Sequence, residues 1–429
     1  MKLNYKRTIL VGFAFFLISA FWQAYDKTIP LIMEYRFGMD QFSSGFIMAL
    51  DNILAVFMLP LFGAISDKTS TRFGRRTPFI LIGTVAAVIS FIFIPFIGNV
   101  WLFIALLLVT LIAMATFRSP AVALMPDVTV KPLRSKANAV INLMGTAGGI
   151  LVLVLGMIIT VNKDNMDNLF PYYVATCGIM LVGLIVFILT VKEPSWAREM
   201  QDEQDKLDAE APVSDEATAT PKSKLTKSQL TSLLLILASV ALWFMGYNAI
   251  TSKYSLYATE VLEQSYDLTL LIAQGAAIVS YIPVGIVASK FGRKKTILVG
   301  VAMLATAFFS AIFMTASSPE FLMYIIFALA GIAWATINVN SFPMVVELAK
   351  EGDVGKYTGW YYTASMSAQI LTPVLSGAIM TFLFDDKMTP LFPYATICVA
   401  AAFVTMFFVK HGDSKPEAGS KLEALGGDD

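Results

Sequence analysis

Cysteine, histidine and charged residues are all scarce in this chain of 429 residues. The two cysteines are too few for a disulfide framework, and no Cys-x-x-Cys pair indicates zinc or redox chemistry. The only histidine, His411, lies near the C-terminus, which excludes a histidine proton relay among the apolar segments. Charged residues make up 14% of the chain, against about 25% in a soluble domain. This shortfall excludes an ordinary soluble enzyme and a disordered protein.

Hydrophobic residues are correspondingly abundant, at 57% of the chain, and the mean hydropathy is +0.69. A bilayer core of about 30 Å requires roughly 20 apolar residues in a helix. Runs that are apolar on every face are not open strands, because lipid leaves no partner for unpaired backbone groups. The sequence predicts an all-α membrane protein with twelve transmembrane helices in two pseudo-symmetric six-helix bundles. The expected spans are 8–33, 41–65, 78–98, 101–125, 137–161, 171–191, 228–252, 267–289, 296–316, 320–346, 357–383 and 391–409.

The first span shares some features with a secretory signal peptide. Three basic residues precede it, and Ala20 could mark a cleavage site. The apolar run continues beyond Ala20 to Met33, which makes it long enough to cross the bilayer. We therefore expect an uncleaved first helix.

The distribution of Lys and Arg predicts the orientation, because these residues accumulate in cytoplasmic loops. With the N-terminus inside, the inside segments carry 25 of the Lys and Arg residues and the outside segments carry 4. The sequence thus predicts a multi-pass protein of the cell membrane with both termini in the cytoplasm.

Residues 192–227 interrupt the apolar pattern. This segment carries nine acidic and six basic residues, with Ala, Thr, Ser and Pro between them, which is typical of a solvated, flexible linker. The predicted organisation is an N-terminal bundle (1–191), a cytoplasmic linker (192–227), a C-terminal bundle (228–410) and a cytoplasmic tail (411–429).

Short matches in register relate the two halves. The tripeptide FGR at 73–75 recurs at 291–293, and LFPY at 169–172 recurs at 391–394. The offsets are 218 and 222 residues, so each match occupies the same place in its half. Two parallel six-span repeats are typical of a secondary transporter whose site lies between the halves near the bilayer midplane.

The segment between the second and third spans, GAISDKTSTRFGRR at 63–76, combines an acid with a Gly-Arg-Arg sequence. A small residue at its start permits close approach of a neighbouring helix. Its acid lies at a helix end, where it can pair with an arginine or cap another helix, and the arginines can face anionic headgroups. A plain basic loop is the alternative reading. We favour a conformational latch made of Gly63, Asp67, Arg72, Gly74, Arg75 and Arg76.

This segment resembles the loop between spans two and three of the major facilitator superfamily. Its longer form, SDKTSTRFGRRTPFILIG at 66–83, is similar to the glycoside–pentoside–hexuronide:cation symporters and the related plant sucrose/proton carriers. FRSP at 117–120 and RSKAN at 134–138 also look like that group. The resemblance implies the major facilitator fold and symport of a sugar with a cation.

Four ionisable residues stand out inside the predicted spans, where a charge costs several kcal/mol and so needs a reason. Asp26 and Lys27 lie on the first span, Asp51 on the second and Arg118 on the fourth. Sequence neighbours do not face each other on a helix, so Lys27 is expected to pair with Asp51. That pairing would leave Asp26 directed into the cavity as the proton site. A purely structural triad that holds the first two spans together is the alternative.

The choice of coupling ion rests on the same resemblance. The sodium users of the sugar–cation group carry an acidic pair on span two, and the matching positions here are Ala55 and Leu59. The missing acids favour protons over sodium, with Asp26, Lys27 and Asp51 as the proton-coupling candidates. We expect no cofactor and no metal site.

The spans of the second half carry almost no charge but many aromatic and amide side chains. This mixture suits a sugar, because aromatic faces contact its C–H groups and amides bond its hydroxyls. For any single one of these residues, packing is the alternative role. The substrate-cavity candidates are Arg118, Tyr247, Asn248, Gln274, Trp334, Asn338, Tyr361 and Gln369.

These patterns together predict a proton-coupled importer of a di- or oligosaccharide or glycoside, which works by alternating access as a monomer in the bilayer. An exporter or antiporter of another small molecule is the first alternative, although GTAGG at 145–149 lacks the Gly-Pro pair common in exporters of this superfamily. A membrane enzyme or a non-transporting sensor is the second, but no catalytic motif or output domain is present. Lys+Arg and Asp+Glu both number 31, so nothing indicates nucleic acid.

Overall fold

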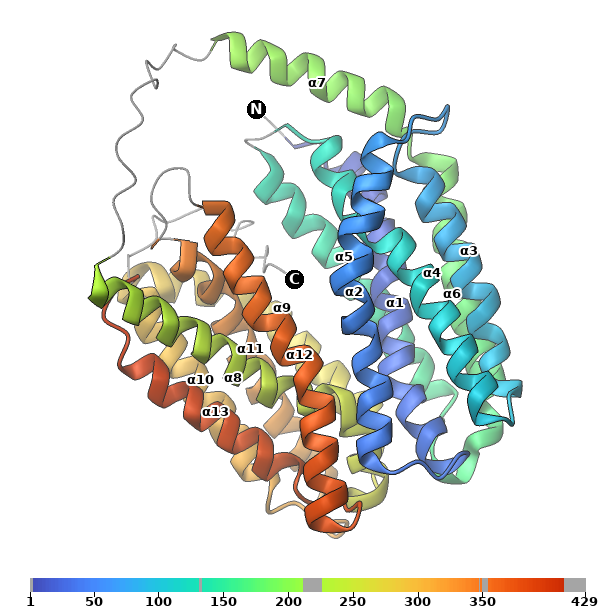
Figure 1. The fold of residues 1–429 in the computed structure, drawn as a ribbon, viewed down its shortest axis with the longest axis vertical. Helices are drawn as coiled ribbons and strands as arrows, with labels where there is room; N and C mark the ends of the chain where they lie inside the picture. Colours follow the sequence, from blue (N-terminus) through green and yellow to red (C-terminus); the bar gives the residue numbers. More distant parts are fainter. Residues whose placement is uncertain (1–2, 131–132, 211–225, 347, 349–353, 413–429) are drawn as a thin grey trace.

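Among the residues that the structure describes, each half of the molecule contains six long helices. The first half consists of α1 (Tyr5–Tyr35), α2 (Gln41–Lys68), α3 (Thr77–Phe93) with the short η1 (Ile94–Phe96), α4 (Val100–Asp127), α5 (Arg134–Ile158), η3 (Lys163–Asn168) and α6 (Leu169–Thr190). The second consists of α8 (Lys227–Tyr257) with the π turn η4 (Ala258–Leu262), α9 (Asp267–Phe291), α10 (Arg293–Ala311), α11 (Glu320–Val346), α12 (Val354–Phe384) and α13 (Leu391–Phe407). Figure 1 shows the two bundles beside each other.

These helices belong to a computed structural model that describes residues 3–130, 133–210, 226–346, 348 and 354–412. Within these described residues, ten helices are long and apolar enough to cross a membrane, and α9 and α13 contribute shorter apolar helices. The predicted fold class, twelve membrane helices in two bundles, is confirmed.

The linker differs from its prediction. Helix α7 (Glu193–Glu210) occupies its first half, where we expected a flexible chain. This helix packs on the first half: the Arg7 guanidinium pairs with Glu199 and lies 4.9 Å from the ring centroid of Trp196. The composition of the segment is polar enough for a linker, but a polar helix gains stability from such fixed contacts. Residues 211–225 and the tail from 413 onward lie outside the described residues.

Side chains in the loops fix several helix starts. The Asp40 carboxylate accepts a hydrogen bond from the Ser43 backbone N–H (2.8 Å) at the start of α2. Asn99 does the same for Trp101 (2.9 Å) at the start of α4. Such caps satisfy amides that have no partner within the first helical turn.

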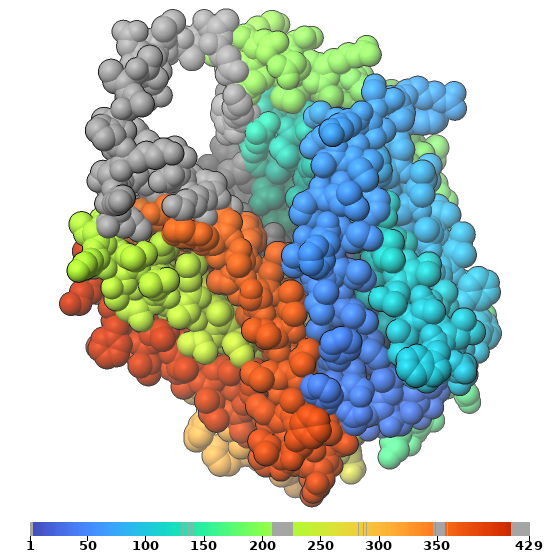
Figure 2. Space-filling model, in the orientation of Figure 1, coloured from blue at the N-terminus to red at the C-terminus, as the bar shows by residue number. Residues whose placement is uncertain are grey.

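The two ends of the bundle are different. We call the end that carries α7, the loop between α2 and α3 and the start of α1 the terminal side, and the opposite end the far side. Helices α2 and α12 lie side by side at the far side and diverge toward the terminal side (Figure 1). In the space-filling view, the two halves also meet at the far side (Figure 2).

Glycines permit this close contact between the halves. A Cβ atom at Gly45 would lie 2.0 Å from the carbonyl oxygen of Pro373, and one at Gly377 would lie 2.2 Å from the carbonyl oxygen of Gln41. Any larger residue would therefore collide with backbone, so α2 and α12 meet through their main chains. Hydrogen bonds accompany the contact, including one from the Lys253 ammonium to the Gln41 amide oxygen (2.7 Å).

Candidate functional site

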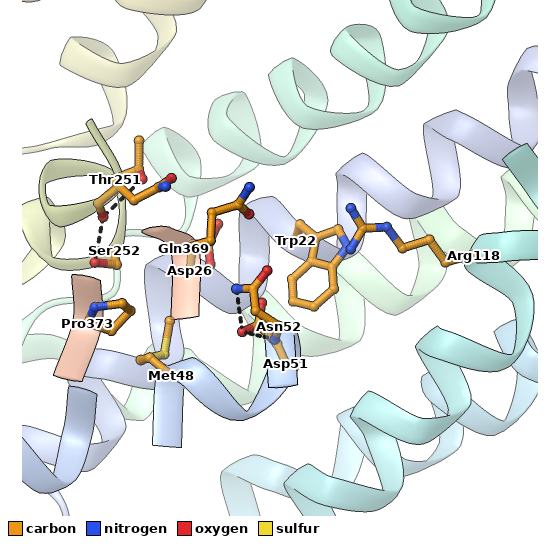
Figure 3. Close-up of a pocket in the computed structure, with 11 residues that line it drawn as sticks. Trp22, Asp26, Met48, Asp51, Asn52, Arg118, Thr251, Ser252, Gln369 and Pro373 are labelled. Atoms are coloured by element: carbon orange, nitrogen blue, oxygen red, sulfur yellow. Dashed lines mark hydrogen bonds between the residues drawn. The ribbon is translucent and has the colours of Figure 1, made fainter. Parts of the chain in front are cut away.

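A cavity of about 190 Å³ lies between the two halves (Figure 3). Helices α1, α2 and α4 of the first half and α8 and α12 of the second supply its walls. The lining residues are Trp22, Asp26, Met48, Asp51, Asn52, Arg118, Asn248, Thr251, Ser252, Gln369 and Pro373. A repeat transporter is expected to hold its site in this position, between its halves.

Most of the lining can form hydrogen bonds. Asn248, Thr251 and Ser252 occupy one turn of α8, and the two hydroxyls donate to the Asn248 carbonyl oxygen at 3.3 and 2.7 Å. Two N–H donors, Trp22 Nε1 and Asn248 Nδ2, are buried without an acceptor among the described residues. Buried polar groups are nearly always bonded, so these two donors are available to a solute or water in the cavity.

Two carboxyl groups and one guanidinium share this cavity. Asp51 accepts from the Asn52 side-chain amide (2.8 Å), and the positive charge of Arg118 acts on it. Arg118 also lies 5.7 Å from the ring centroid of Trp22. Asp26 has no ion-pair partner among the described residues. The cavity therefore holds one carboxylate that is stabilised by its neighbours and one that has no cation beside it.

The predicted pairing of Lys27 with Asp51 is wrong. The Lys27 ammonium binds Asp267 instead, at 2.6 Å, and both side chains are 1% exposed. Asp267 is the first residue of α9, so this pair joins the two halves at the far side. Sequence reasoning compared depths only within the first half, and the acid at the start of the eighth span was therefore missed. The available signal was the position of Asp267 in an apolar span, at a helix start and next to the aromatic residue Tyr266.

The substrate candidates of the second half divide into two groups. Asn248 and Gln369 line the cavity, as does Arg118 from the first half. Gln274 donates to Gln23 across the halves (2.8 Å) but is not part of the lining. Asn52, Thr251 and Ser252 line the cavity without having been predicted; nothing in their local sequence distinguishes them from other polar residues of a span.

The remaining four candidates pack inside the second half. The Trp334 ring stacks on Tyr247, with centroids 3.7 Å apart and planes at 7°. The Tyr361 hydroxyl bonds to Ser341 (2.8 Å), and Asn338 is buried. These four predicted residues, Tyr247 included, lie outside the lining of the cavity. Packing, which was the alternative role for each, describes their observed contacts.

The predicted latch residues form a cluster within the first half. Buried Arg76 binds Asp67, at the end of α2, and donates from Nε to Asp127 at the end of α4 (2.8 Å). Arg75 reaches the same Asp127 at 2.8 Å. Burial acts to lower the pKa of Arg76, but the hydrogen bonds and charges of Asp127 and Asp67 raise it above its ordinary value. The expectation that Arg76 faces lipid headgroups is therefore wrong.

The other three latch residues make separate contacts. Gly74 has φ = +113° and leaves room for Glu193 of α7, which a Cβ atom would approach to 2.3 Å. Gly63 faces Ser119 of α4, which a Cβ atom would approach to 2.9 Å. Arg72 is exposed and lies over the Phe73 ring at 4.6 Å.

The carboxylate of Glu193 caps the start of α3, a contact that sequence reasoning missed. It accepts from the backbone N–H groups of Arg75 (2.7 Å), Arg76 (2.9 Å) and Thr77 (2.8 Å), and from the Thr77 hydroxyl (2.7 Å). A helix start offers unpaired N–H groups and a positive dipole, so a carboxylate is stabilised there. Helix α3 has no cap of its own, and that absence was the available signal.

Metal ligands are not gathered anywhere in the described part of the chain: no three His, Cys, Asp or Glu side chains come together as a possible ion site.

Comparisons with known proteins agree with this architecture. The sequence matches the Major Facilitator Superfamily over residues 11–373 and again over residues 264–425. The chain is 24% identical over 304 residues to the class B tetracycline resistance protein of Escherichia coli, covering 67% of this chain and 68% of that protein.

Solved transporter structures have the same fold at low identity. The inward-open xylose transporter XylE from Escherichia coli matches with a TM-score of 0.66 and 16% identity, covering 98% of this chain and 99% of that one. The nucleoside transporter NupG matches with a TM-score of 0.66 and 15% identity, covering 93% and 98%. A bacterial homologue of the human drug peptide transporters matches with 0.67 and 14%, covering 95% and 98%.

The family match, together with two helical bundles and a polar cavity between them, indicates a membrane transport protein rather than an enzyme. The chain belongs to the Major Facilitator Superfamily, and it is a multi-pass membrane transporter of small molecules.

Proposed function

We propose that this transporter imports a small polyhydroxylated solute of the sugar class together with a proton. The observation that carries the proposal is the set of polar groups around the cavity. Trp22 and Asn248 have unpaired N–H donors and line the same cavity as two carboxyl groups. A hydroxyl group accepts from the donors and donates to the acids, so a polyol satisfies both kinds of group at once.

Asp26 is the proposed proton carrier. Acidic residues at membrane depth commonly mark proton relays in transporters. Asp26 lines the cavity and has no ion-pair partner among the described residues, so the proton that it takes up is not displaced by a neighbouring cation. Asp51, which accepts from the Asn52 side chain and feels the charge of Arg118, is the proposed acid that orients the solute.

Sodium is the weaker choice of coupling ion. Ala55 and Leu59, the positions that match the acidic pair of the sodium users, border a void of only about 10 Å³ beside the cavity. Such a space is about the size of one water molecule, and these two side chains offer no oxygen ligands.

The size of the cavity favours a small solute. Its volume of about 190 Å³ lies below the roughly 300–1,000 Å³ of sites for drug-sized ligands. In this conformation a monosaccharide or small glycoside fits the space better than the di- or oligosaccharide that we first expected. With the orientation predicted from Lys and Arg, the far side is the outside of the cell membrane, and the conformation is inward-facing.

Proton-driven export is the second candidate, because the sequence is also similar to a tetracycline resistance protein. Import and export differ in the direction in which solute and proton move. In symport the added solute carries protons with it into the vesicle, whereas in antiport solute uptake releases protons from the vesicle.

The test is a proton-flux measurement in proteoliposomes that contain the purified transporter and a pH indicator outside. A panel of monosaccharides and glycosides is added without a pre-formed gradient. Symport predicts alkalinisation of the outside with one or more sugars, and Asp167→Asn, which changes an exposed acid, serves as the matched control. Acidification of the outside would indicate antiport. A response that requires sodium and leaves the pH unchanged would contradict proton coupling.

A further inference from the structure

The ion pair between Lys27 and Asp267 is the most enclosed charged contact between the halves in the described part of the chain. Its N–O distance is 2.6 Å, and each side chain is 1% exposed. The ammonium also lies 4.8 Å from the ring centroid of Tyr172 and 5.0 Å from that of Tyr266, so two aromatic faces cover it. A cation over an aromatic face is stabilised by the ring, more strongly when water is absent.

Backbone from a third helix completes the enclosure. A Cβ atom at Gly156 of α5 would lie 2.2 Å from the Lys27 nitrogen and 2.4 Å from an oxygen of Asp267. Glycine therefore leaves the space that the pair occupies. Next to it, the Tyr266 hydroxyl donates to the Val161 carbonyl oxygen across the halves (2.8 Å). Every one of these contacts joins the first half to the second or surrounds a group that does.

We propose that the Lys27–Asp267 pair is the far-side gate of the transporter, formed when that side is closed and separated when it opens. The proposal rests on the alternating movement in the proposed function, but it requires neither a particular solute nor a particular ion. Since the two charges come from opposite halves, the far side cannot open without parting them. Once parted, each charge is hydrated, so opening exchanges one enclosed pair for two solvated ions.

The position of Lys27 also connects the gate to the cavity. Its neighbour on α1, Asp26, lines the cavity, and successive residues of a helix point about 100° apart. A rotation or shift of α1 that follows a change at Asp26 therefore moves Lys27 relative to Asp267. Adjacent residues of one rigid helix can in this way link occupancy of the cavity to closure of the far side.

Removing one partner should have a much larger effect than removing both. A single neutralisation leaves the other charge enclosed without a counter-ion whenever the far side is closed, while the open state hydrates it. Lys27→Met or Asp267→Asn should therefore raise the ratio of far-side-open to far-side-closed molecules by roughly 100-fold. The double variant removes the stranded charge and should return the ratio to within about tenfold of the unmodified protein.

The experiment measures distances between spin labels in the absence of solute. Labels on cysteines at Asp167 and Ala316, exposed on the far side of opposite halves, report opening there; labels at Ser70 and Lys290 report closing of the terminal side. The background lacks the two native cysteines. Each single variant is expected to show a long far-side distance together with a shortened terminal-side distance. This paired change distinguishes a shifted equilibrium from unfolding, which would broaden both distributions.

Three comparisons make the outcome decisive. Lys387→Met removes an exposed far-side lysine and should leave both distances unchanged. Asp267→Asn should restore the closed far side to Lys27→Met, whereas Asp51→Asn should not. Unchanged far-side distances in folded single variants, or restoration by Asp51→Asn instead, would overturn the gate. Because no sugar or pH gradient is used, this result is independent of the proton-flux test of the proposed function.

Discussion

Loss of the Glu193 carboxylate should destabilise the first half of the transporter more than any other single change in α7. Glu193 is 2% exposed and accepts four hydrogen bonds at the start of α3. In Glu193→Ala the buried N–H groups of Arg76 and Thr77 lose their acceptor, at about 1–3 kcal/mol for each stranded group. Part of this is recovered by water, so we expect a loss of about 3 kcal/mol.

The assay is thermal unfolding of the purified protein in detergent, monitored by a thiol-reactive fluorescent dye or by intrinsic tryptophan fluorescence. At roughly 2–4 °C per kcal/mol for a unit of this size, the midpoint should fall by about 6–12 °C. Glu199→Ala is the matched control: its side chain is 59% exposed in an ion pair with Arg7, and exposed pairs contribute about 0–1 kcal/mol. Equal midpoints for Glu193→Ala and Glu199→Ala would refute the capping role.

Three further outcomes follow from the described contacts. Asp127→Asn should slow uptake more than Asp67→Asn, because Asp127 binds both arginines of the cluster whereas Asp67 binds one. The measurement is the initial uptake rate per transporter molecule in the membrane. Equal rates for the two variants would argue against the cluster as a latch. Gln369→Ala should weaken solute affinity by roughly tenfold through loss of one hydrogen bond. Trp334→Ala should have a smaller effect, because its ring stacks outside the cavity. Calorimetry measures both affinities, and a larger loss for Trp334→Ala would show that Trp334 contacts the solute. Gly45→Ala should force α2 from the α12 backbone and lengthen the far-side spin-label distance, and an unchanged distance would show that the helices tolerate the added Cβ.

The fold could be predicted from the sequence because the bilayer imposes one simple requirement. Each span must be about 20 apolar residues of helix, so length and hydropathy are sufficient to place it. The repeat at 73–75 and 291–293 gave the division into halves. Helix α7 was missed because its residues are polar on most sides, and its stability depends on Glu193, Arg7 and Trp196 contacts that join distant parts of the chain.

The candidate site could be predicted only in part. Ionisable residues at membrane depth are few, so Asp26, Asp51 and Arg118 were recognised, and all three line the cavity. Their partners depend on how helices from the two halves face each other, which a one-dimensional pattern does not specify. Lys27 was therefore assigned to an acid of similar depth in its own half, while the structure pairs it with Asp267.

Aromatic and amide residues were the least predictable group. Trp334 and Asn248 occupy similar depths in apolar spans, and each can either pack or bind a solute. Only the rotation of each helix decides between these roles: Asn248 faces the cavity, and Trp334 stacks on Tyr247.

The most direct test of the central claim, proton coupling through Asp26, compares uphill accumulation with downhill exchange in proteoliposomes. A radiolabelled sugar identified by the flux screen is supplied with an inward proton gradient, and separately as counterflow against unlabelled sugar. Asp26→Asn should abolish accumulation driven by the gradient but retain counterflow, because a neutral amide resembles the protonated acid and leaves the exchange of bound sugar possible. Accumulation by Asp26→Asn at the level of the unmodified protein would contradict the assignment and transfer the coupling role to Asp51.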